Sequence, residues 1–472
     1  MASDEFSGKL YEAHEPVFPR KVHGTFRTLK WTIMIVALGV YYITPWIRWD
    51  RGPNLPDQAV LIDLAGRRFF FFWIEIWPHE FYFIAGLLIM AGLGLFLFTS
   101  ALGRVWCGYA CPQTVWTDLF IATERWIEGD RNARIRLWNS PWNARKIRLR
   151  AFKWTVWLAI GLATGGAWVF YFADAPTLLK DIVTGNAHPI AYVTIALLTA
   201  TTFFFGGIAR EQICIYACPW PRIQAAMMDE DTITIAYREW RGEPRGKGKN
   251  REGLGDCIDC QACANVCPMG IDIRDGQQLE CITCGLCIDA CDEMMDKVGK
   301  PRGLIGYIAL KDEPLERSGG EHLPVTKHIF RPRTLLYTVL WGGVGLALLI
   351  ALFVRPVIDL TVRPVRNPTY VVLSDGAVRN TYDVGIRNKN GDDRPFTFSL
   401  GDGTDLSIQL EGVDGLTVVA PADAEYKQRL YIIAPAGSKE ATSDRTELRL
   451  WITDDKSGDR AYKDTVFNGK GQ

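Results

Sequence analysis

The sequence lacks the features that identify several common cofactors and ligands. It has no Cys-x-x-Cys-His run, so covalent attachment of a c-type haem is not indicated. None of the six histidines lies in the middle of a long apolar run, so a transmembrane b-type haem is not expected. No GxGxxG after a strand and no P-loop is present, so no nucleotide site is expected. The net charge is zero, which gives no general attraction to nucleic acid, and no nucleic-acid partner is expected.

Cysteine, by contrast, is concentrated in one segment. Eight of the 12 cysteines form two runs of nearly identical spacing: Cys257, Cys260, Cys263 and Cys267, then Cys281, Cys284, Cys287 and Cys291. Three thiolates on this spacing can surround one [4Fe–4S] cluster, while the fourth binds the neighbouring cluster. Zinc ribbons usually pair two Cys-x-x-Cys units across a longer loop, so structural zinc is the weaker alternative. The pattern predicts two [4Fe–4S] clusters and one-electron transfer.

The two cysteine runs differ at one position. The first run ends Cys267-Pro268, whereas the second ends Cys291-Asp292. This change can reshape the turn after Cys291 without removing a ligand.

Five apolar stretches approach the length of about 20 residues that a helix needs to cross a bilayer. They lie at residues 31–47, 81–102, 154–173, 189–208 and 335–354. The aromatic run 69–73 is expected at the membrane interface, because the acidic residues that follow it would be costly at depth. Residues 1–28 are polar and show no cleavage pattern, so the first stretch is expected to be an uncleaved anchor.

Positive charge in the connecting loops predicts the orientation. The loop between the second and third stretches contains ten arginines and lysines, whereas the loop after the third contains Lys180 alone. The positive-inside rule therefore places the N-terminus and the basic loop in the cytoplasm and the C-terminal region outside. All 12 cysteines then lie on the cytoplasmic side, where thiols stay reduced and disulfides are disfavoured.

A repeated motif marks the cytoplasmic ends of the second and fourth stretches. Residues 104–112 and 210–219 each contain Cys-x-Tyr-Ala-Cys-Pro, with the pairs Cys107/Cys111 and Cys214/Cys218. Cysteines four apart share one helical face and can reach a common ligand, and each helix should end before the proline. Thiolates suit Cu(I), zinc or iron–sulfur chemistry. A metal or redox site is predicted; a buried structural thiol pair and a thiol–disulfide relay are the alternatives.

Beyond residue 356 the pattern changes to short β-rich runs separated by turns such as Asn390-Gly391. The expected strands are Thr381–Ile386, Pro395–Leu400, Leu416–Ala420, Arg429–Ile433 and Glu447–Ile452. This spacing predicts an antiparallel, immunoglobulin-like sandwich.

A multi-domain chain is therefore expected. Its predicted parts are a cytoplasmic tail (1–28), a membrane domain with four transmembrane helices and a basic cytoplasmic loop (29–235), a bacterial two-cluster ferredoxin-like α+β domain (236–330), a fifth transmembrane helix (331–356) and an all-β periplasmic immunoglobulin-like domain (357–472).

Together these motifs resemble the FixG/RdxA/CcoG family of cytochrome c oxidase accessory proteins over nearly the whole chain. The resemblance implies a bacterial inner-membrane protein that acts in assembly of the cbb-type haem–copper oxidase by reducing Cu(II) to Cu(I). It implies one cluster on Cys257, Cys260, Cys263 and Cys291, a second on Cys267, Cys281, Cys284 and Cys287, and candidate copper or redox thiols at Cys107, Cys111, Cys214 and Cys218. The implied partners are a cytoplasmic or quinol electron donor, copper chaperones, oxidase assembly factors or subunits, and membrane lipid.

Two other functions stay open at this point. Membrane quinol dehydrogenases of the NapH and NosR type have comparable Cys-x₃-Cys-Pro motifs beside clusters, although a pure quinol relay does not need the outer β domain. The third possibility is an assembly scaffold whose outer domain binds partners and whose clusters are regulatory.

Overall fold

The computed structural model describes residues 16–53, 55–248, 251–321, 323–356, 358–401 and 404–471. The chain divides into two compact units, one holding Met1–Arg48 and Gln58–Leu348, the other Trp49–Asp57 and Leu349–Gln472. The predicted membrane and cluster domains belong to the same unit, so no break in packing separates them at residue 235. Residues 1–15 of the predicted tail lie outside the described residues.

Four helical segments in the described part of the chain have the length and apolar composition needed to cross a membrane. They are Thr25–Trp46, which contains α1 (Thr25–Ile43), α2 (Tyr82–Leu102), Pro189–Ala217, which begins with α8 (Pro189–Thr202), and α16 (Pro332–Val354). These segments coincide with four of the five predicted stretches. The remaining stretch, 154–173, lies mostly in α6 (Ala144–Val169), which does not meet the same criterion. A fifth crossing there stays a prediction.

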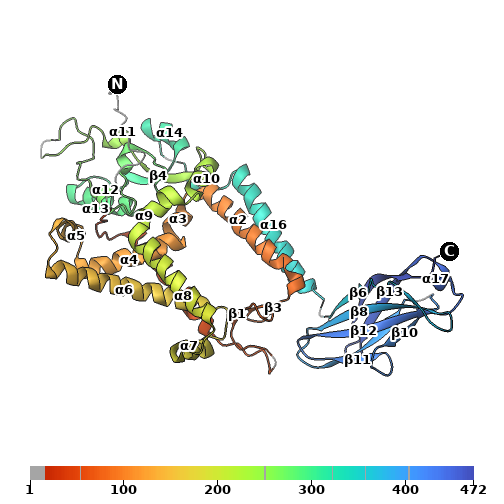
Figure 1. The fold of residues 1–472 in the computed structure, drawn as a ribbon. Coiled ribbons are helices and arrows are strands. Elements are labelled where there is room, and N and C mark those ends of the chain that lie inside the picture. Colours follow the sequence, from red (N-terminus) through yellow and green to blue (C-terminus); the bar gives the residue numbers. More distant parts are fainter. Residues whose placement is uncertain are drawn as a thin grey trace, which may run out of the picture. The chain divides into compact units, whose positions relative to one another are not determined.

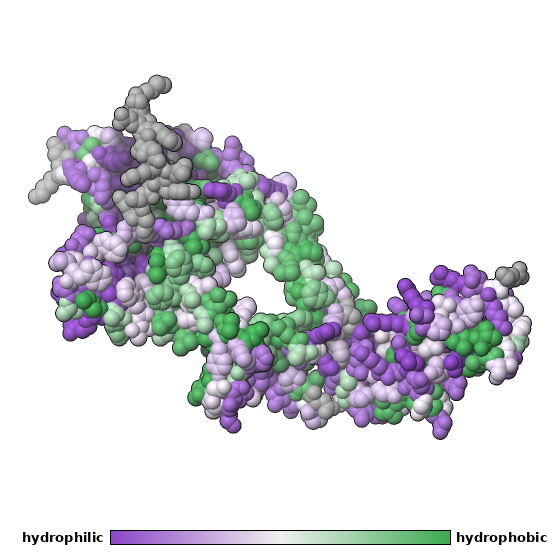
Figure 2. Space-filling model, viewed as in Figure 1, coloured by the Kyte–Doolittle hydropathy of each residue, from purple (hydrophilic) through white to green (hydrophobic). Residues whose placement is uncertain are grey.

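Four of the long helices pack in two pairs. Helices α2 and α16 lie side by side (Figure 1), with the rings of Phe96 and Tyr337 6.1 Å apart. Apolar side chains cover the outer surface of this pair (green in Figure 2). In the other pair, Gly161 and Gly165 of α6 face α8, and a Cβ at Gly165 would lie 2.8 Å from the carbonyl oxygen of Ile195. Small residues at this spacing are typical of membrane helix pairs, so the apolar part of α6 packs as a membrane helix does.

The aromatic run at 69–73 belongs to a small antiparallel sheet. The sheet consists of β1 (Val60–Asp63), β2 (Arg68–Phe71) and β3 (Ile74–Ile76). Arg68 and Glu75 form an ion pair of 3.1 Å across β2 and β3. One of the acidic residues that argued against a membrane span, Glu75, is therefore neutralised within the hairpin.

The predicted basic loop is a set of helices: α3 (Val105–Tyr109), α4 (Pro112–Glu128), α5 (Arg131–Asn139) and the first turns of α6. Two glutamates of α4 bind several of its basic side chains. Glu124 pairs with Arg134 and Lys153, each at 3.1 Å, and Glu128 pairs with Lys153 at 3.0 Å. All of these side chains are almost fully buried. Part of the positive charge that predicted the orientation thus serves as internal ion pairs.

The eight-cysteine segment folds around a two-stranded antiparallel sheet, β4 (Ile233–Tyr237) and β5 (Ile305–Ala309), with α12 (Ala262–Val266) and α13 (Leu286–Val298) beside it. Figure 1 shows this sheet and these helices at the same end of the unit as α3, α9 (Arg210–Gln212) and α10 (Trp220–Met227). Both repeated Cys-x-Tyr-Ala-Cys-Pro motifs therefore lie at the end of the unit that holds the eight cysteines.

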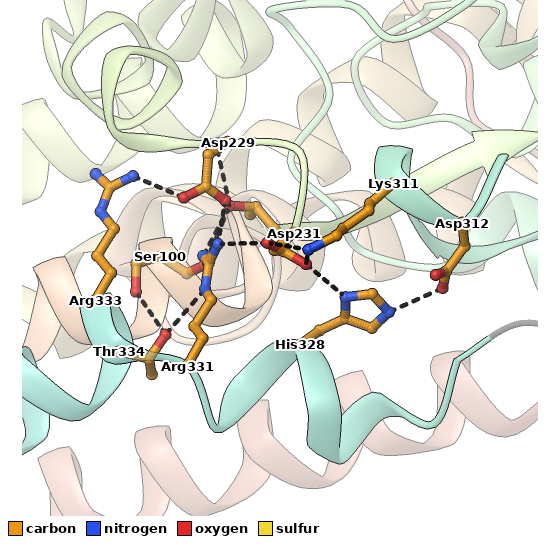
Figure 3. Close-up of polar contacts among 10 residues, drawn as sticks. Ser100, Asp229, Asp231, Lys311, Asp312, His328, Arg331, Arg333 and Thr334 are labelled. Carbon is orange, nitrogen blue, oxygen red and sulfur yellow. Dashed lines mark hydrogen bonds and ion pairs between the residues drawn. The ribbon is translucent and has the colours of Figure 1, made fainter. Parts of the chain in front are cut away.

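A polar network joins this region to the start of α16 (Figure 3). The imidazole of His328 lies between two carboxylates, with Nδ1 3.1 Å from Asp231 and Nε2 2.9 Å from Asp312. Arg331 pairs with Asp229 and also donates to the carbonyl oxygen of Ser100, at the end of α2. The network holds the turn before β4, the end of β5 and two membrane helices together.

The second unit is a β sandwich of two antiparallel sheets. One sheet has the order β10-β12-β8-β6 with β7 paired to β8, and the other has the order β11-β9-β13-β14. The strands are β6 (Ile358–Pro364), β7 (Val371–Val372), β8 (Val378–Asn388), β9 (Arg394–Leu400), β10 (Ser407–Leu410), β11 (Thr417–Ala420), β12 (Ala424–Ala434), β13 (Arg445–Asp454) and β14 (Arg460–Asn468). Each of the five predicted strands corresponds to one of these, and Asn390-Gly391 lies between β8 and β9 as predicted.

Candidate functional site

The eight clustered cysteines line two separate hollows. The first is lined by Cys257, Cys260, Cys263 and Cys291, and the second by Cys263, Cys267, Cys281, Cys284 and Cys287. Cys263 lines both hollows; the other cysteines divide so that the last cysteine of each run lies with the other run. The assignment of cysteines to clusters that the family resemblance implies stays a prediction.

The backbone around the second cysteine of each run has the same unusual conformation. Asp259 and Gln261 flank Cys260 with φ angles of 52° and 57°, and Thr283 and Gly285 flank Cys284 with φ angles of 55° and 75°. Left-handed conformations of non-glycine residues are uncommon and concentrate at functional sites. Alternating left- and right-handed residues turn successive N–H groups toward one side, which suits a negatively charged group. The hollows fit anionic iron–sulfur clusters in both ligand type and backbone.

The Cys-Pro difference between the runs has a structural consequence. Cys267 is extended (ψ 122°) and ends α12, because a residue before proline disfavours the helical region. The second run has no proline, and α13 continues through Cys291 to Val298. The carboxylate of Asp292 accepts a hydrogen bond of 2.9 Å from the backbone N–H of Gly303. Asp292 therefore supports the loop between α13 and β5 without displacing Cys291 from the hollow.

The repeated motif does not have the helical geometry predicted from its spacing. Cys107 lies in α3, which ends at Tyr109, whereas Cys111 precedes α4. Cys214 lies in a π-helical segment, η4 (Ile213–Ala217), and Cys218 follows it. Neither cysteine pair therefore lies on one uninterrupted α-helical face. The predicted stops are present, however, because Cys111 and Cys218 are extended (ψ 129° and 120°) before their prolines.

The structure brings the four motif thiols into one neighbourhood. Cys214 interacts electrostatically with Cys107, Cys111 and Cys218. The thiol of Cys107 is buried and donates a hydrogen bond of 3.2 Å to Gln224. Burial raises the pKa of Cys107, and the nearby thiols of Cys111 and Cys218 raise it further. Within the described residues, no three or more His, Cys, Asp or Glu side chains converge closely enough to hold a single metal ion, these four thiols included.

The motif thiols lie directly beside the second hollow. Cys107 and the partly buried Cys214 pack in the same apolar cluster as Cys267 and Cys284. Gly108 lies against the cysteine loop: a Cβ added to it would be 2.6 Å from the carbonyl oxygen of Ile282 and 3.2 Å from the backbone N of Cys284. Only a residue without a side chain allows this approach. The membrane-edge motif and the second hollow therefore form one continuous site.

Sequence reasoning missed three residues of this contact. Tyr109 donates a hydrogen bond of 2.9 Å to the carbonyl oxygen of Cys284, Gly108 permits the close approach, and Gln224 binds Cys107. Gly108 and Tyr109 lie inside the first motif, but Ile215 occupies the place of Gly108 in the second, so the repeat gave no signal for a glycine. Gln224 lies on α10, outside any recognisable sequence motif.

Comparisons with known proteins bear on both parts of the site. A sequence family model described as a 4Fe-4S dicluster domain matches residues 209–309, which include the second motif and all eight clustered cysteines. Another, described as a 4Fe-4S binding domain, matches residues 83–132, which include the first motif. A third, described as the IG-like fold at the C-terminal of FixG, matches residues 348–470. These matches show iron–sulfur domains and an immunoglobulin-like C-terminal domain.

A distant similarity extends to the ferredoxin-type protein NapH of Escherichia coli. That protein is 24% identical to 42% of this chain, and the match spans 62% of NapH.

Much closer relatives match nearly the whole chain. The proteins RdxB and RdxA of Cereibacter sphaeroides are 68% and 65% identical, covering 99% and 95% of this chain and the same shares of their own lengths. The nitrogen fixation protein FixG of Rhizobium meliloti is 52% identical over 94% of this chain and 88% of its own. The chain therefore belongs to the FixG/RdxA family and is a membrane-associated 4Fe–4S electron-transfer protein.

Proposed function

We propose that this protein reduces Cu(II) to Cu(I) for assembly of a cbb-type cytochrome c oxidase. In this proposal one [4Fe–4S] cluster is held by Cys257, Cys260, Cys263 and Cys291, and a second by Cys267, Cys281, Cys284 and Cys287. Copper is the substrate, and it is reduced at Cys107, Cys111, Cys214 and Cys218. The observation on which the proposal rests is the direct packing of Cys107 and Cys214 against the second hollow.

This packing supports electron transfer between the two thiol groups. The rate of electron transfer falls steeply with distance, so donor and acceptor groups need to lie close together. Gly108 lies within contact distance of Ile282 and Cys284, and Tyr109 is hydrogen-bonded to Cys284. No further layer of side chains separates this backbone from the cysteine loop. An electron at the second hollow is thus adjacent to the proposed copper site.

The chemistry of sulfur favours the direction of the reaction. Each Cu(II) ion gains one electron to become Cu(I), and each [4Fe–4S] cluster supplies one electron. Soft thiolate ligands prefer Cu(I), so thiols at the membrane edge stabilise the reduced ion once it forms. Because the four thiols are not convergent in this structure, we expect copper to draw them together on binding.

The proposed electron entry lies at the first hollow. Cys260 is exposed, whereas Cys257, Cys263 and Cys291 are buried, so a donor can approach the first hollow at Cys260. We propose a cytoplasmic or quinol donor there, with the N-terminus and both clusters on the cytoplasmic side of the bacterial inner membrane. The immunoglobulin-like unit would then be periplasmic and bind copper chaperones, oxidase assembly factors or oxidase subunits.

Quinol oxidation is the second candidate function. A small cavity adjoins Cys214 and is lined by Lys30, Asp118 and Glu211 as well as Ile282 of the cysteine loop, but it has room for about one water molecule. Asp118 already pairs with Arg27 at 2.8 Å, so a quinol would have to open this region to bind there. The distant similarity to NapH covers 42% of this chain. The scaffold alternative is supported by no comparable feature.

The test compares wild-type protein with the quadruple variant Cys107→Ser, Cys111→Ser, Cys214→Ser and Cys218→Ser. Both proteins are purified anaerobically, reduced, and mixed with Cu(II) and a Cu(I)-specific chelator. We expect Cu(I) from the wild type and a loss of at least tenfold in its initial rate in the variant, with iron content and EPR signals unchanged. Equal rates in the two proteins would refute the thiol site. Oxidised wild-type protein is the control for Cu(II) reduction by thiols alone.

A further inference from the structure

Arg104 is a buried cation at the junction of the motif thiols and the second hollow. It precedes α3, and its side chain is 3% exposed. One guanidinium nitrogen donates to the carbonyl oxygen of Leu279, two residues before Cys281. The Nε atom is buried without a hydrogen-bond partner. Among the described residues, no carboxylate forms an ion pair with Arg104.

The contacts of Arg104 place its charge beside both thiol groups. Arg104 is three residues before Cys107, and Leu279, whose carbonyl oxygen accepts its hydrogen bond, is two residues before Cys281. A single buried cation therefore lies beside both the first motif and the second cysteine run.

Other arginines in equivalent places are neutralised by carboxylates. Arg210 begins the second motif as Arg104 begins the first, yet it pairs with Glu124 at 2.9 Å. Arg274 lines the first hollow and pairs with Asp259 at 2.7 Å and with Asp272 at 2.5 Å. Arg104, by contrast, has no carboxylate partner among the described residues and binds the carbonyl oxygen of Leu279, close in sequence to Cys281.

The first hollow has a more mixed electrostatic environment. Arg251 donates to backbone carbonyl oxygens there, including that of Cys257 at 3.2 Å. The carboxylates of Asp272 and Asp292 lie near Cys263 and Cys291 and oppose added negative charge. The two hollows therefore do not share one charge pattern, and each has its own arginine to test.

We propose that Arg104 raises the reduction potential of the second cluster. An electron shared between the two clusters then resides preferentially on the second cluster, which lies next to the motif thiols. The physical reason is that reduction adds one negative charge, which a nearby buried cation stabilises in a medium of low dielectric constant. Arg104 is thus a positioning residue: it acts on the cluster through space and through the Leu279 carbonyl. The inference rests on the proposed assignment of Cys267, Cys281, Cys284 and Cys287 as cluster ligands.

The test is an EPR-monitored redox titration of the full-length protein in detergent. Arg104→Gln should lower the midpoint potential of one cluster by about 59 mV or more. A shift of this size corresponds to a tenfold change in a one-electron equilibrium. The midpoint potential of the other cluster should not change. Arg104→Lys, which keeps the positive charge, should retain most of the wild-type potential. The affected signal is assigned with Cys281→Ser and Cys257→Ser variants.

The control is Arg251→Gln, which also removes an arginine that donates to a carbonyl oxygen beside a hollow. Arg251→Gln should change the midpoint potential of the first cluster alone. If Arg104→Gln does not fold, Gln224→Glu places a carboxylate next to Cys107 and should lower the same potential by giving Arg104 a counter-ion. Two clusters with unchanged potentials in Arg104→Gln, or an equal shift of both, would overturn the inference. Absence of both signals from the wild type would instead refute the cluster assignment in the proposed function.

Discussion

The hydroxyl group of Tyr109 donates a hydrogen bond of 2.9 Å to the backbone carbonyl oxygen of Cys284. The first residue belongs to the motif at the end of a membrane helix, and the second to the middle of the second cysteine run, 175 positions later in the chain. A bond of this kind fixes the cysteine loop against the membrane-edge segment. The proposed path from the clusters to copper depends on that contact.

Gly108→Ala should disrupt the contact without touching a cysteine. The new Cβ would meet the carbonyl oxygen of Ile282 at 2.6 Å, so the two segments must move apart, at a cost of about 1–3 kcal/mol. We expect both clusters to be retained but Cu(I) to form more slowly in a single turnover. Gly166→Ala is the matched control, because a Cβ there meets no atom within 4 Å. Equal rates for the two variants would contradict the contact's role.

Glu124→Gln should destabilise the unit severely. The carboxylate of Glu124 neutralises three buried cations: Arg134, Lys153 and Arg210, at 2.9–3.1 Å. Removing one partner of a buried ion pair costs about 3–5 kcal/mol. The melting temperature in detergent should fall clearly. Glu293→Gln, which breaks an exposed pair with Lys297, should cost only about 0.5 kcal/mol and serves as the control.

Acid should weaken the same network. Burial alone would raise the pKa of Glu124, but Arg210, Lys153 and Arg134 lower it from 4.5 to about 2. A lowered pKa means that the stabilisation is complete above the unfolded value and is lost as the pH falls from 4.5 through about 2. The difference in melting temperature between wild type and Glu124→Gln should therefore shrink as the pH falls across that range. A difference that stays constant would show that the charge of Glu124 is not the cause.

His328→Asn should loosen the junction shown in Figure 3. The shorter side chain cannot bridge Asp231 and Asp312, and Asp312 is only 3% exposed. Leaving a buried charged group without its partner costs about 2 kcal/mol. Hydrogen exchange should rise between β5 and the start of α16. Lys311→Gln removes only an exposed contact of 3.3 Å with Asp231, so its exchange should match the wild type if the imidazole is the essential link.

Features set by local chemistry were predictable from the sequence. Extended backbone before proline is present at Cys111 and Cys218, where helix ends were expected, since the clash with the proline ring is a property of neighbouring residues. The same effect ends α12 at Cys267. The five predicted strands of the sandwich appeared for a similar reason, because alternation and turn residues act within a few positions. The assignment of the eight cysteines to two clusters followed from motif resemblance and stays a prediction, since Cys263 lines both hollows.

Features that join distant segments were not predictable. The spacing of Cys107 and Cys111 suggested one helical face, but α3 ends between them, and tertiary contact with Ile282 fixes the segment instead. Likewise, the sequence showed Arg104 only as one charge of a basic loop. Its position between Cys107 and Cys281 depends on how residues far apart in the chain pack together.

The most direct test of the account is a single-turnover experiment on reduced, anaerobic protein mixed with Cu(II) and a Cu(I)-specific chelator. EPR counts the clusters that become oxidised, while the chelator counts Cu(I). The account predicts one Cu(I) for each reduced cluster lost, with both quantities greatly slowed when Cys107, Cys111, Cys214 and Cys218 are replaced by serine. Clusters that stay reduced while Cu(I) forms, or that are oxidised at the wild-type rate without the four thiols, would contradict it.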